Sequence, residues 1–191
     1  MLTLAACGGS GSGTSASPGA SADASPTVSQ GTVTGFGSVI VDGDRISDTS
    51  ATVETVGDGG LARAGKSADV KLGQRVEVDR AADGSARTIR VVPELIGVVS
   101  ALDALNKTLT VNTNTVRTNA DPTSGPVTTY GGYSAFGDIA VSDRVEVHGY
   151  PVVSGTGTLT IQATRIEQKA ASTAALVTGT IGSLASGSFR L

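Results

Sequence analysis

The sequence has very few of the residues on which most catalytic, redox and metal chemistry depends. Its 191 residues include one cysteine, one histidine, one methionine and no tryptophan, and aromatic residues make up only 3% of the chain. The single cysteine, Cys7, excludes an intrachain disulfide and a multi-cysteine zinc site. The single histidine, His148, has neither a second histidine nor an available cysteine to complete a metal site, and no motif supplies it with a catalytic partner. We therefore expect no bound metal and no catalysis at His148.

Clusters of positive charge and long apolar runs are also missing. The 14 Lys and Arg residues are scattered among 17 Asp and Glu residues, and the net charge is −3. Nucleic-acid binding depends on clustered Lys and Arg, so the composition argues against such a partner. No apolar run approaches the length of about 18 residues that spans a bilayer. Because the Gly-x-Ser-x-Gly, Walker and dinucleotide-binding motifs do not occur either, the sequence predicts a protein that is not an enzyme and has no cofactor.

What the sequence does contain favours short β-strands. Glycine accounts for 26 residues, and Ala, Thr, Ser and Val are abundant, a mixture that suits strands joined by tight turns. Residues 75–78 alternate between charged and branched apolar side chains, which is the period of a strand. Asp42-Gly43 and Asp83-Gly84 are typical of hairpin turns. Since no segment shows a helical apolar stripe, we expect an all-β fold.

Three blocks of sequence recur in the same order, which indicates an internal repeat. The matching pairs are residues 31–37 with 97–103, residues 70–78 with 139–147, and residues 86–91 with 163–167. Units of this size with several short strands predict small antiparallel β-barrels, because closure removes exposed sheet edges. The sequence leaves an OB-like and an SH3-like topology open. We expect tandem barrels over residues 31–94 and 95–169, and the truncated start of a third repeat over residues 176–191.

The amino terminus carries a short motif with a possible role in anchoring. Leu4-Ala5-Ala6-Cys7-Gly8 resembles the lipobox of bacterial lipoproteins, in which the cysteine is lipidated after cleavage of the signal peptide. Residues 1–7 are then the remnant of a lipoprotein signal. Only six residues precede Cys7 and none of them is basic, whereas a secretory signal needs a basic start and about 7–15 apolar residues. We therefore expect that the printed start lies downstream of the true one.

The segment after the lipobox favours a flexible tether. Residues 8–30 are made mostly of Gly, Ser, Ala, Thr and Pro, and such a segment cannot bury enough apolar surface to fold. We expect it to be a disordered linker between a lipid anchor and the barrels. The resemblance implies a location in the bacterial cell envelope. No aspartate follows Cys7, which favours the outer membrane, and the periplasmic and surface sides both stay open.

The first unit carries a more specific signature. Its sequence Gly31-x-Val33-x-Gly35-Phe36-Gly37-Ser38-Val39-Ile40-Val41-Asp42-Gly43, with Leu72-Gly73 before Val76-Glu77-Val78, resembles the family called domain of unknown function 5666. The resemblance covers residues 31–93 well and residues 96–168 more loosely. These bacterial domains recur in tandem, often behind lipoprotein signals. The resemblance therefore implies an architecture and an envelope location, and it implies no activity.

Candidate sites are few. The loop of residues 129–137 carries Tyr130, Tyr133 and Phe136, which either contact a ligand or partner or pack back onto the end of the barrel. Asp42, Asp44 and the nearby Asp48 invite a calcium interpretation, but their spacing lacks the pattern of an EF-hand, so a hairpin turn is favoured. On alternation, His148 lies opposite Val145 and Val147, and we expect it to face solvent.

These observations favour a non-catalytic interaction or ligand-binding module of the cell envelope. Its partner would be an envelope protein, a polysaccharide or a small ligand, in addition to the membrane that holds the lipid anchor. A structural spacer at the cell surface is the alternative. A small hydrolase and a nucleic-acid-binding OB protein are disfavoured by the missing nucleophile–base pair and by the charge. A binding module should show a concave or aromatic surface in the second unit that the first lacks.

Overall fold

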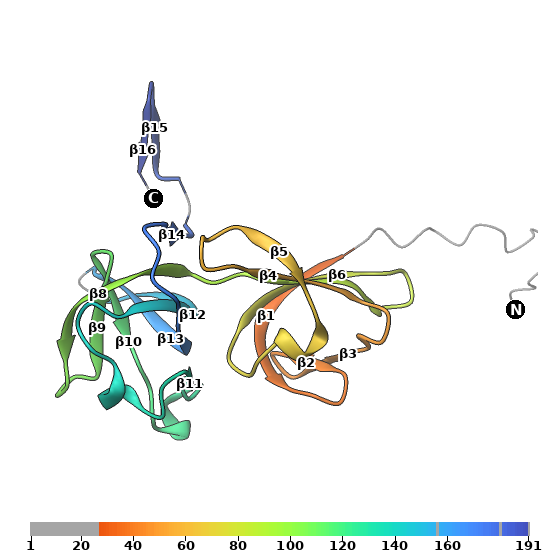
Figure 1. Ribbon diagram of the computed structural model, residues 1–191. Helices are drawn as coiled ribbons and strands as arrows, with labels where there is room; N and C mark the ends of the chain where they lie inside the picture. The colour runs from red at the N-terminus through yellow and green to blue at the C-terminus, as the bar shows by residue number, and fades with distance from the viewer. Residues whose placement is uncertain (1–26, 156, 180, 191) are drawn as a thin grey trace, which may run out of the picture.

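The protein is all-β, as the sequence predicts. The structure is a computed structural model that describes residues 27–155, 157–179 and 181–190, and it contains two small β-barrels followed by a separate hairpin (Figure 1). Cys7, the lipobox and residues 8–26 of the expected linker lie outside the described residues. Residues 28–30, which were expected to belong to that linker, form the start of the first strand because they pair with residues 77–79.

The first unit is a barrel of short strands. Its elements are β1 (Val28–Gly35), β2 (Val39–Val41), β3 (Asp44–Ile46), β4 (Thr52–Val56), β5 (Ala62–Gly65), the 3₁₀ helix η1 (Ser67–Asp69), β6 (Arg75–Arg80) and β7 (Ala86–Val91). The strand order is β3-β2-β1-β6-β7-β4-β5. All pairs are antiparallel except β4 with β7, which is parallel. Asp42-Gly43 forms the predicted turn between β2 and β3.

The second unit repeats this order and closes its barrel. Its elements are β8 (Leu95–Asp103), β9 (Thr108–Val111), β10 (Asn114–Arg117), η2 (Pro122–Ser124), β11 (Thr129–Gly131), η3 (Phe136–Asp138), β12 (Arg144–Val153) and β13 (Leu159–Gln168). The order is β10-β9-β8-β12-β13-β11, and β10 also pairs with β13 in parallel. This connectivity is that of an OB-like barrel, one of the two topologies that the sequence left open.

Equivalent backbone contacts relate the two units. In the first unit the N–H of Gly73 donates to the carbonyl of Val33, and in the second the N–H of Ser142 donates to the carbonyl of Val99. The pairing register shifts at the same point of both first strands, after Val33 and after Val99, which marks a β-bulge in each. The two units therefore share an equivalent backbone hydrogen bond and an equivalent β-bulge.

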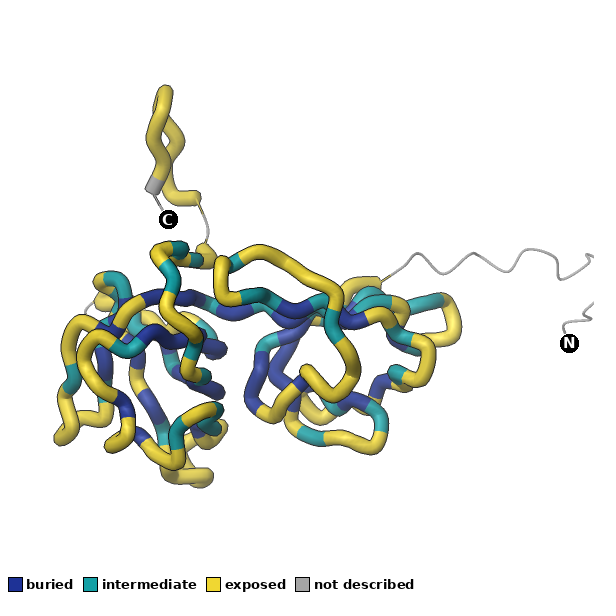
Figure 2. The backbone as a smooth tube through the Cα atoms, in the orientation of Figure 1, coloured by how far each residue is buried: buried dark blue, intermediate teal, exposed yellow. Residues whose placement is uncertain are grey.

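Each unit encloses a core of apolar residues, most of them branched, and Figure 2 shows the buried positions in both units. Val76 and Val78 are fully buried, whereas the charged residues between and beside them are half-buried on the other face of β6. The first core consists of Val33, Val39, Val41, Ile46, Val53, Val70, Val76, Val78, Ala86, Ile89 and Val91. The second consists of Leu95, Val99, Leu109, Val111, Val116, Phe136, Ile139, Val145, Val147, Ile161, Ala163 and Ile166.

The C-terminal segment stands apart from both cores. The strand β14 (Leu176–Val177) pairs with β8, whereas β15 (Ser183–Ala185) and β16 (Ser188–Arg190) pair only with each other. Leu184 and Phe189 lie opposite each other in this hairpin and are 78% and 61% exposed. In the described part of the chain, no helix has the length and apolar character needed to cross a membrane.

Candidate functional site

A groove lies on the outer surface of the second unit, where β9, β10, the end of β12 and β13 meet. It encloses about 350 Å³ and is lined by Asn106, Thr108, Thr115, Arg117, Val152, Ser154, Thr160 and Gln162. A second depression of about 400 Å³ adjoins it and is lined by Asn106, Lys107, Arg117, Thr118, Asn119, Ala120, Asp121, Ser124 and Gln162. Both depressions share Asn106, Arg117 and Gln162, so we treat them together as one feature, the β9–β10 groove.

Strand alternation explains why the floor of the groove is polar. In the β9–β10 hairpin Leu109 lies opposite Val116 and both are buried in the core. Their neighbours Thr108 and Arg117 form the next pair and point to the other face. One face of the hairpin therefore builds the barrel, and the other offers hydroxyls and a guanidinium to solvent.

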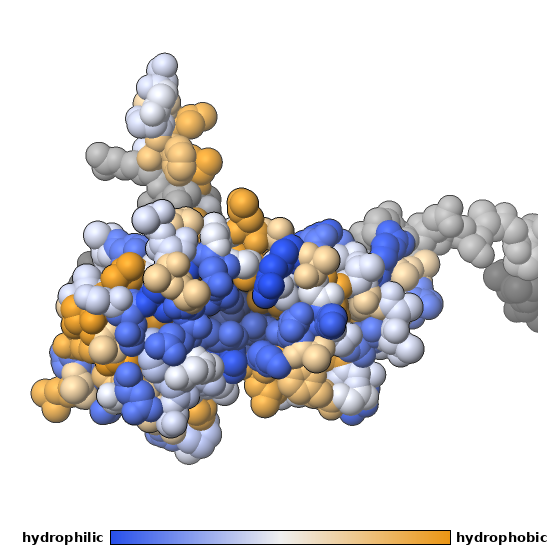
Figure 3. Space-filling view, in the orientation of Figure 1, coloured by the Kyte–Doolittle hydropathy of each residue, from blue (hydrophilic) through white to orange (hydrophobic). Residues whose placement is uncertain are grey.

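The length of the β12–β13 hairpin supplies a wall of the groove. Each of these strands has ten residues, whereas the corresponding strands β6 and β7 have six each. The added length brings the pair Val152 and Thr160 alongside the groove. Figure 3 shows apolar residues gathered on the flank of this unit, over β8 and β9. The concave surface thus depends on an extension that the first unit lacks.

The loop between β8 and β9 is held in place by one carboxylate. Asp103 accepts hydrogen bonds from the backbone N–H groups of Leu105 and Asn106 at 3.0 Å and from the Asn106 carboxamide at 2.6 Å. These bonds lower the pKa of Asp103, and the bond from the backbone N–H of Asn106 has the largest effect. The next residue, Lys107, accepts two bonds on its carbonyl from Thr118, and its ammonium lies 5.4 Å from the centre of the Phe136 ring. This end of the groove is therefore preorganised.

A second loop that borders the groove is also held by a carboxylate. Asp121 precedes η2 and accepts bonds from the hydroxyl and the backbone N–H of Thr123 and from the hydroxyl of Ser124, which lower its pKa. The Asn119 carboxamide donates to the carbonyls of Asp121, Gly125 and Pro126. Both loops that border the groove therefore keep their shape through internal bonds.

The groove offers hydrogen bonds and positive charge. Three carboxamides, several hydroxyls, the carboxylate of Asp121 and two cations, Arg117 and Lys107, line it, and no aromatic ring does. Neither cation takes part in an ion pair within the described ranges of the chain. The Gln162 carboxamide donates to the carbonyl of Arg117 and so ties β10 to β13 at the base of the groove. Such a lining can bind an extended polar ligand.

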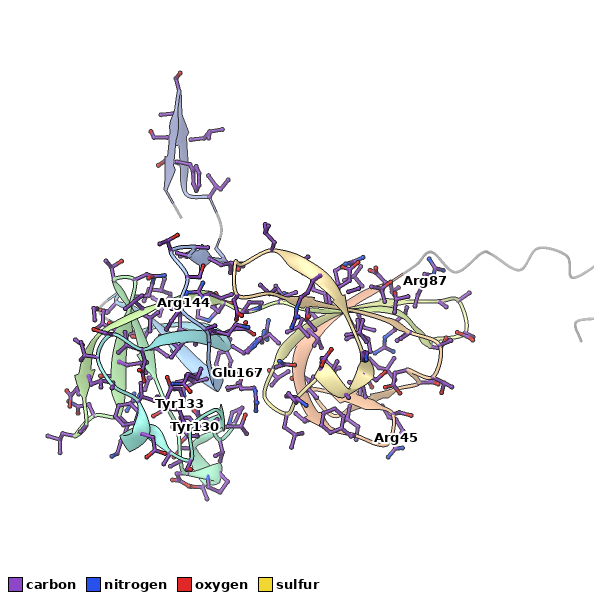
Figure 4. All side chains as sticks on the ribbon, in the orientation of Figure 1. Arg45, Arg87, Tyr130, Tyr133, Arg144 and Glu167 are labelled. Atoms are coloured by element: carbon purple, nitrogen blue, oxygen red, sulfur yellow. The ribbon has the colours of Figure 1, made fainter. Side chains whose placement is uncertain are left out.

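The structure directs the three aromatic residues proposed for ligand contact into the second unit. Phe136 is 8% exposed and belongs to the core, and Tyr130 and Tyr133 pack against that core. Figure 4 shows both tyrosines inside the second unit, near β11. The Tyr133 hydroxyl donates to Asp143 at 2.9 Å; burial raises the pKa of this phenol, and the bond to Asp143 adds to the effect. These rings cap the barrel, and Phe136 reaches the groove only through Lys107.

The prediction that His148 faces solvent is wrong, because its side chain is fully buried. Alternation placed it correctly on the outer face of β12, opposite Val147, but the first unit covers that face. Its Nδ1 accepts the backbone N–H of Arg75 from the first unit at 3.2 Å. The proton therefore resides on Nε2, which donates to the Glu146 carboxylate at 2.9 Å. His148 thus joins the two units.

Charged side chains surround this joint. Lys169 lies 3.0 Å from Glu146 and 3.6 Å from Asp58 of the first unit, and Arg165 pairs with Glu167. Burial by itself would raise the pKa of Glu146, but His148 and the Lys169 ammonium outweigh that effect and lower it. Figure 4 shows Glu167 on the side of the second unit that faces the first.

The same cluster raises the question of a metal ion, since donor atoms of Glu146, His148 and Glu167 lie within 4.8 Å of one another. The residues do not fit a metal well. Lys169 and Arg165 already neutralise the two carboxylates, and both ring nitrogens of His148 are engaged in hydrogen bonds. A divalent ion would have to displace these two cations from buried ion pairs, and the free energy lost with those pairs opposes metal binding. We assign the cluster to the joint between the units.

The acidic residues Asp42 and Asp44 take part in separate contacts, with no shared site between them in the described residues. Asp42 accepts the N–H of Thr32 at 2.9 Å, and Asp44 pairs with Arg80 at 2.7 Å. Asp42 has a φ of 49°, which suits the first position of a two-residue hairpin turn. The turn interpretation agrees with this geometry.

Sequence reasoning missed the residues of the groove, although one signal was present. Arg117 and Gln162 are 45 positions apart, and only the parallel pairing of β10 with β13 brings them together. The segment between the blocks 139–147 and 163–167 is longer than the segment between the blocks 70–78 and 86–91. This difference could have indicated an extended hairpin in the second unit.

The comparisons with known proteins support the family that the sequence resembles. Residues 96–167 match the family model described as Domain of unknown function (DUF5666). The match spans most of the second unit, from β8 into β13, where the sequence resemblance was the looser one. No curated protein and no solved structure matches the chain. The family description assigns no activity.

Proposed function

We propose that the protein is a non-catalytic binding module of the bacterial cell envelope, and that the β9–β10 groove holds an extended polar ligand such as a polysaccharide segment. The observation that carries this proposal is a preorganised concave surface on the second and third strands of an OB-like barrel. OB barrels bind oligosaccharides and oligonucleotides on this face, between the loops that border it. The scarcity and scatter of basic residues favour the sugar over the nucleic acid.

The location forms part of the same proposal. The lipobox resemblance at Cys7 and the Gly- and Ser-rich residues that follow it support a lipid anchor with a spacer. The similar order of strands in both units supports a tandem array in which residues 31–93 form a further member of the family. A module of this kind would hold a ligand of the envelope close to the membrane.

Blocking the groove tests its role. The Thr115→Trp variant places a large ring on the outer face of β10, where it should abolish binding of soluble polysaccharide fragments followed by NMR chemical-shift perturbation. Arg45 is the corresponding residue of β3, because each residue lies one pair beyond the pair that flanks its hairpin turn. Arg45→Trp therefore adds the same bulk in the first unit and should leave binding unchanged. Shift changes that survive in Thr115→Trp would locate the ligand elsewhere.

Intact mass tests the anchor. In a bacterial host, a gene extended upstream should give a membrane-extracted product whose mass includes acyl groups. The Cys7→Ser variant should lack that added mass and appear in the soluble fraction. An unacylated product of the unmodified gene would remove the anchor from the proposal.

A spacer function is the second candidate, and the joint between the units favours it. The Thr164 hydroxyl donates to the Gly73 carbonyl at 2.6 Å, and the Gln74 carboxamide donates to Glu167 at 2.9 Å. Direct bonds of this kind hold two units at a fixed angle, as a spacer requires. Absence of binding to any polysaccharide, together with small-angle scattering that fits a rigid pair of barrels, would favour the spacer.

A further inference from the structure

Building on the proposed binding groove, we infer that its ligand is an acidic glycan and that Arg117 is the residue that selects it. A uronic acid carries a carboxylate on an extended, hydroxyl-rich chain. A guanidinium binds such a carboxylate through two parallel N–H···O bonds, which neutral sugars cannot accept in the same way.

The position of Arg117 suits this role. It lines both halves of the groove, so a ligand that runs along the groove passes its side chain. Its backbone is fixed where the barrel closes, because Arg117 pairs with Thr108 on one side and with Gln162 on the other. The guanidinium has no carboxylate partner among the ion pairs of the described residues. The cation is thus held on a rigid strand and is available to a ligand.

The charges around Arg117 leave room for an anion. Lys107 adds a second positive charge in the adjoining half of the groove. Two carboxylates lie nearby, Asp103 and Asp121, but each is turned toward its own loop and accepts at least three hydrogen bonds there. The N–H and O–H donors therefore partly compensate the negative charge of Asp103 and Asp121. A ligand carboxylate, by contrast, would bind the guanidinium of Arg117 directly.

The rest of the lining argues against other ligands. Binding of neutral sugars and of single-stranded nucleic acid commonly relies on aromatic rings that stack on the ligand, and no ring lines this groove. The carboxamides of Asn106 and Gln162 and the hydroxyls of Thr108 and Thr160 can bind sugar hydroxyl groups. A carboxylated glycan can therefore bind the cations, the carboxamides and the hydroxyls of the groove.

The test compares a charged glycan with its uncharged methyl ester. The full chain is titrated by calorimetry with oligogalacturonate and with the same oligomer after methyl esterification. We expect the acid to bind at least about tenfold more tightly than the ester, with an affinity that falls as salt is added. Arg117→Gln should lose this preference, whereas Arg87→Gln, at an exposed position of β7 in the first unit, should keep it.

Each other outcome overturns a different statement. Equal binding of acid and ester, or a preference that survives in Arg117→Gln, would overturn the selection of acidic glycans while leaving the groove as a binding site. Tighter binding of oligothymidylate than of oligogalacturonate would overturn the glycan in favour of a nucleic acid. Absence of binding by every oligomer, with Thr115→Trp indistinguishable from the unmodified chain, would overturn the proposed function as well.

Discussion

At the scale of single residues, Gly73 shows how closely the two units approach. Its φ of 82° lies in the left-handed region, and a Cβ at this position would lie 2.4 Å from the carbonyl oxygen of Thr164 in the second unit. The equivalent residue of the second unit is Ser142, whose φ is 79°. The joint therefore requires a glycine for two reasons, the backbone conformation and the close approach.

Alanine substitutions separate these two reasons. Gly84 has a φ of 81° with nothing within 4 Å of its Cβ position, so Gly84→Ala should cost only the strain of the backbone, about 1 kcal/mol. Gly73→Ala should cost about 2–4 kcal/mol because the joint must also open. Chemical denaturation gives both values, and small-angle scattering should show a larger radius of gyration for Gly73→Ala alone. Equal effects of the two substitutions would mean that the joint yields easily.

Tyr133 gives a second prediction at this scale. Tyr133→Phe removes the bond from the hydroxyl to Asp143, and we expect a loss of about 1–2 kcal/mol in thermal denaturation at pH 7. Burial first, and then the bond to Asp143, raise the pKa of Tyr133. This contribution is complete below the unfolded pKa of about 10 and is lost as the pH rises further, so the difference between the two proteins should shrink in alkali. A constant difference up to pH 11 would contradict this role.

At the scale of elements, β12 combines a core face with a buried polar face. Val145 and Val147 enter the core, as alternation predicts, whereas Glu146 and His148 lie on the other face under the first unit. A single strand is thus buried on both sides, although only one of its faces is apolar. The cost of burying Glu146 is offset by its contacts with His148 and Lys169.

The depressed pKa of Glu146 makes this contribution depend on pH. A carboxylate of this kind stabilises the fold fully above the unfolded pKa of about 4.3, and the contribution is lost as the pH falls through the lower folded value. Glu146→Gln should cost about 2–4 kcal/mol at pH 7, and that cost should diminish below pH 4. Glu77→Gln, at the equivalent position of β6, should cost less than about 0.5 kcal/mol at either pH. Denaturation curves at pH 7 and pH 3 provide the comparison, and a cost independent of pH would contradict it.

An element could be predicted from the sequence when the residues that form it lie close together along the chain. Period-two alternation correctly assigned Val76 and Val78 to the core, and Asp42-Gly43 to a hairpin turn, because both signals are local. The environment of His148 could not be predicted in this way, since its cover comes from Arg75, 73 positions away. The groove escaped prediction for the same reason, because it needs a barrel that closes between β10 and β13.

At the scale of the whole molecule, polar contacts link the two barrels. Hydrophilic residues cover the surface where the units meet (Figure 3). The link also reaches beyond the second barrel, because Arg144 donates to the carbonyls of Ala170 and Ala174 in the segment that leads to β14. Leu176 and Val177 then pair with β8, and Thr178 donates to the carbonyl of Glu94. This segment therefore belongs to the packed part of the molecule, whereas the β15–β16 hairpin beyond it does not.

Two deletions test where the packed molecule stops. Removal of residues 181–191 deletes a hairpin whose apolar pair, Leu184 and Phe189, is exposed, so the melting temperature of the barrels should change by less than about 2 °C. Removal of residues 170–191 also deletes the acceptors of Arg144 and the strand β14, and it should cost about 1–3 kcal/mol, because Arg144 is 5% exposed and would lose hydrogen-bond partners. Calorimetric melting of the three chains measures both effects. A large loss from the shorter deletion would mean that the hairpin packs on the barrels, and the apolar pair would then belong to their core.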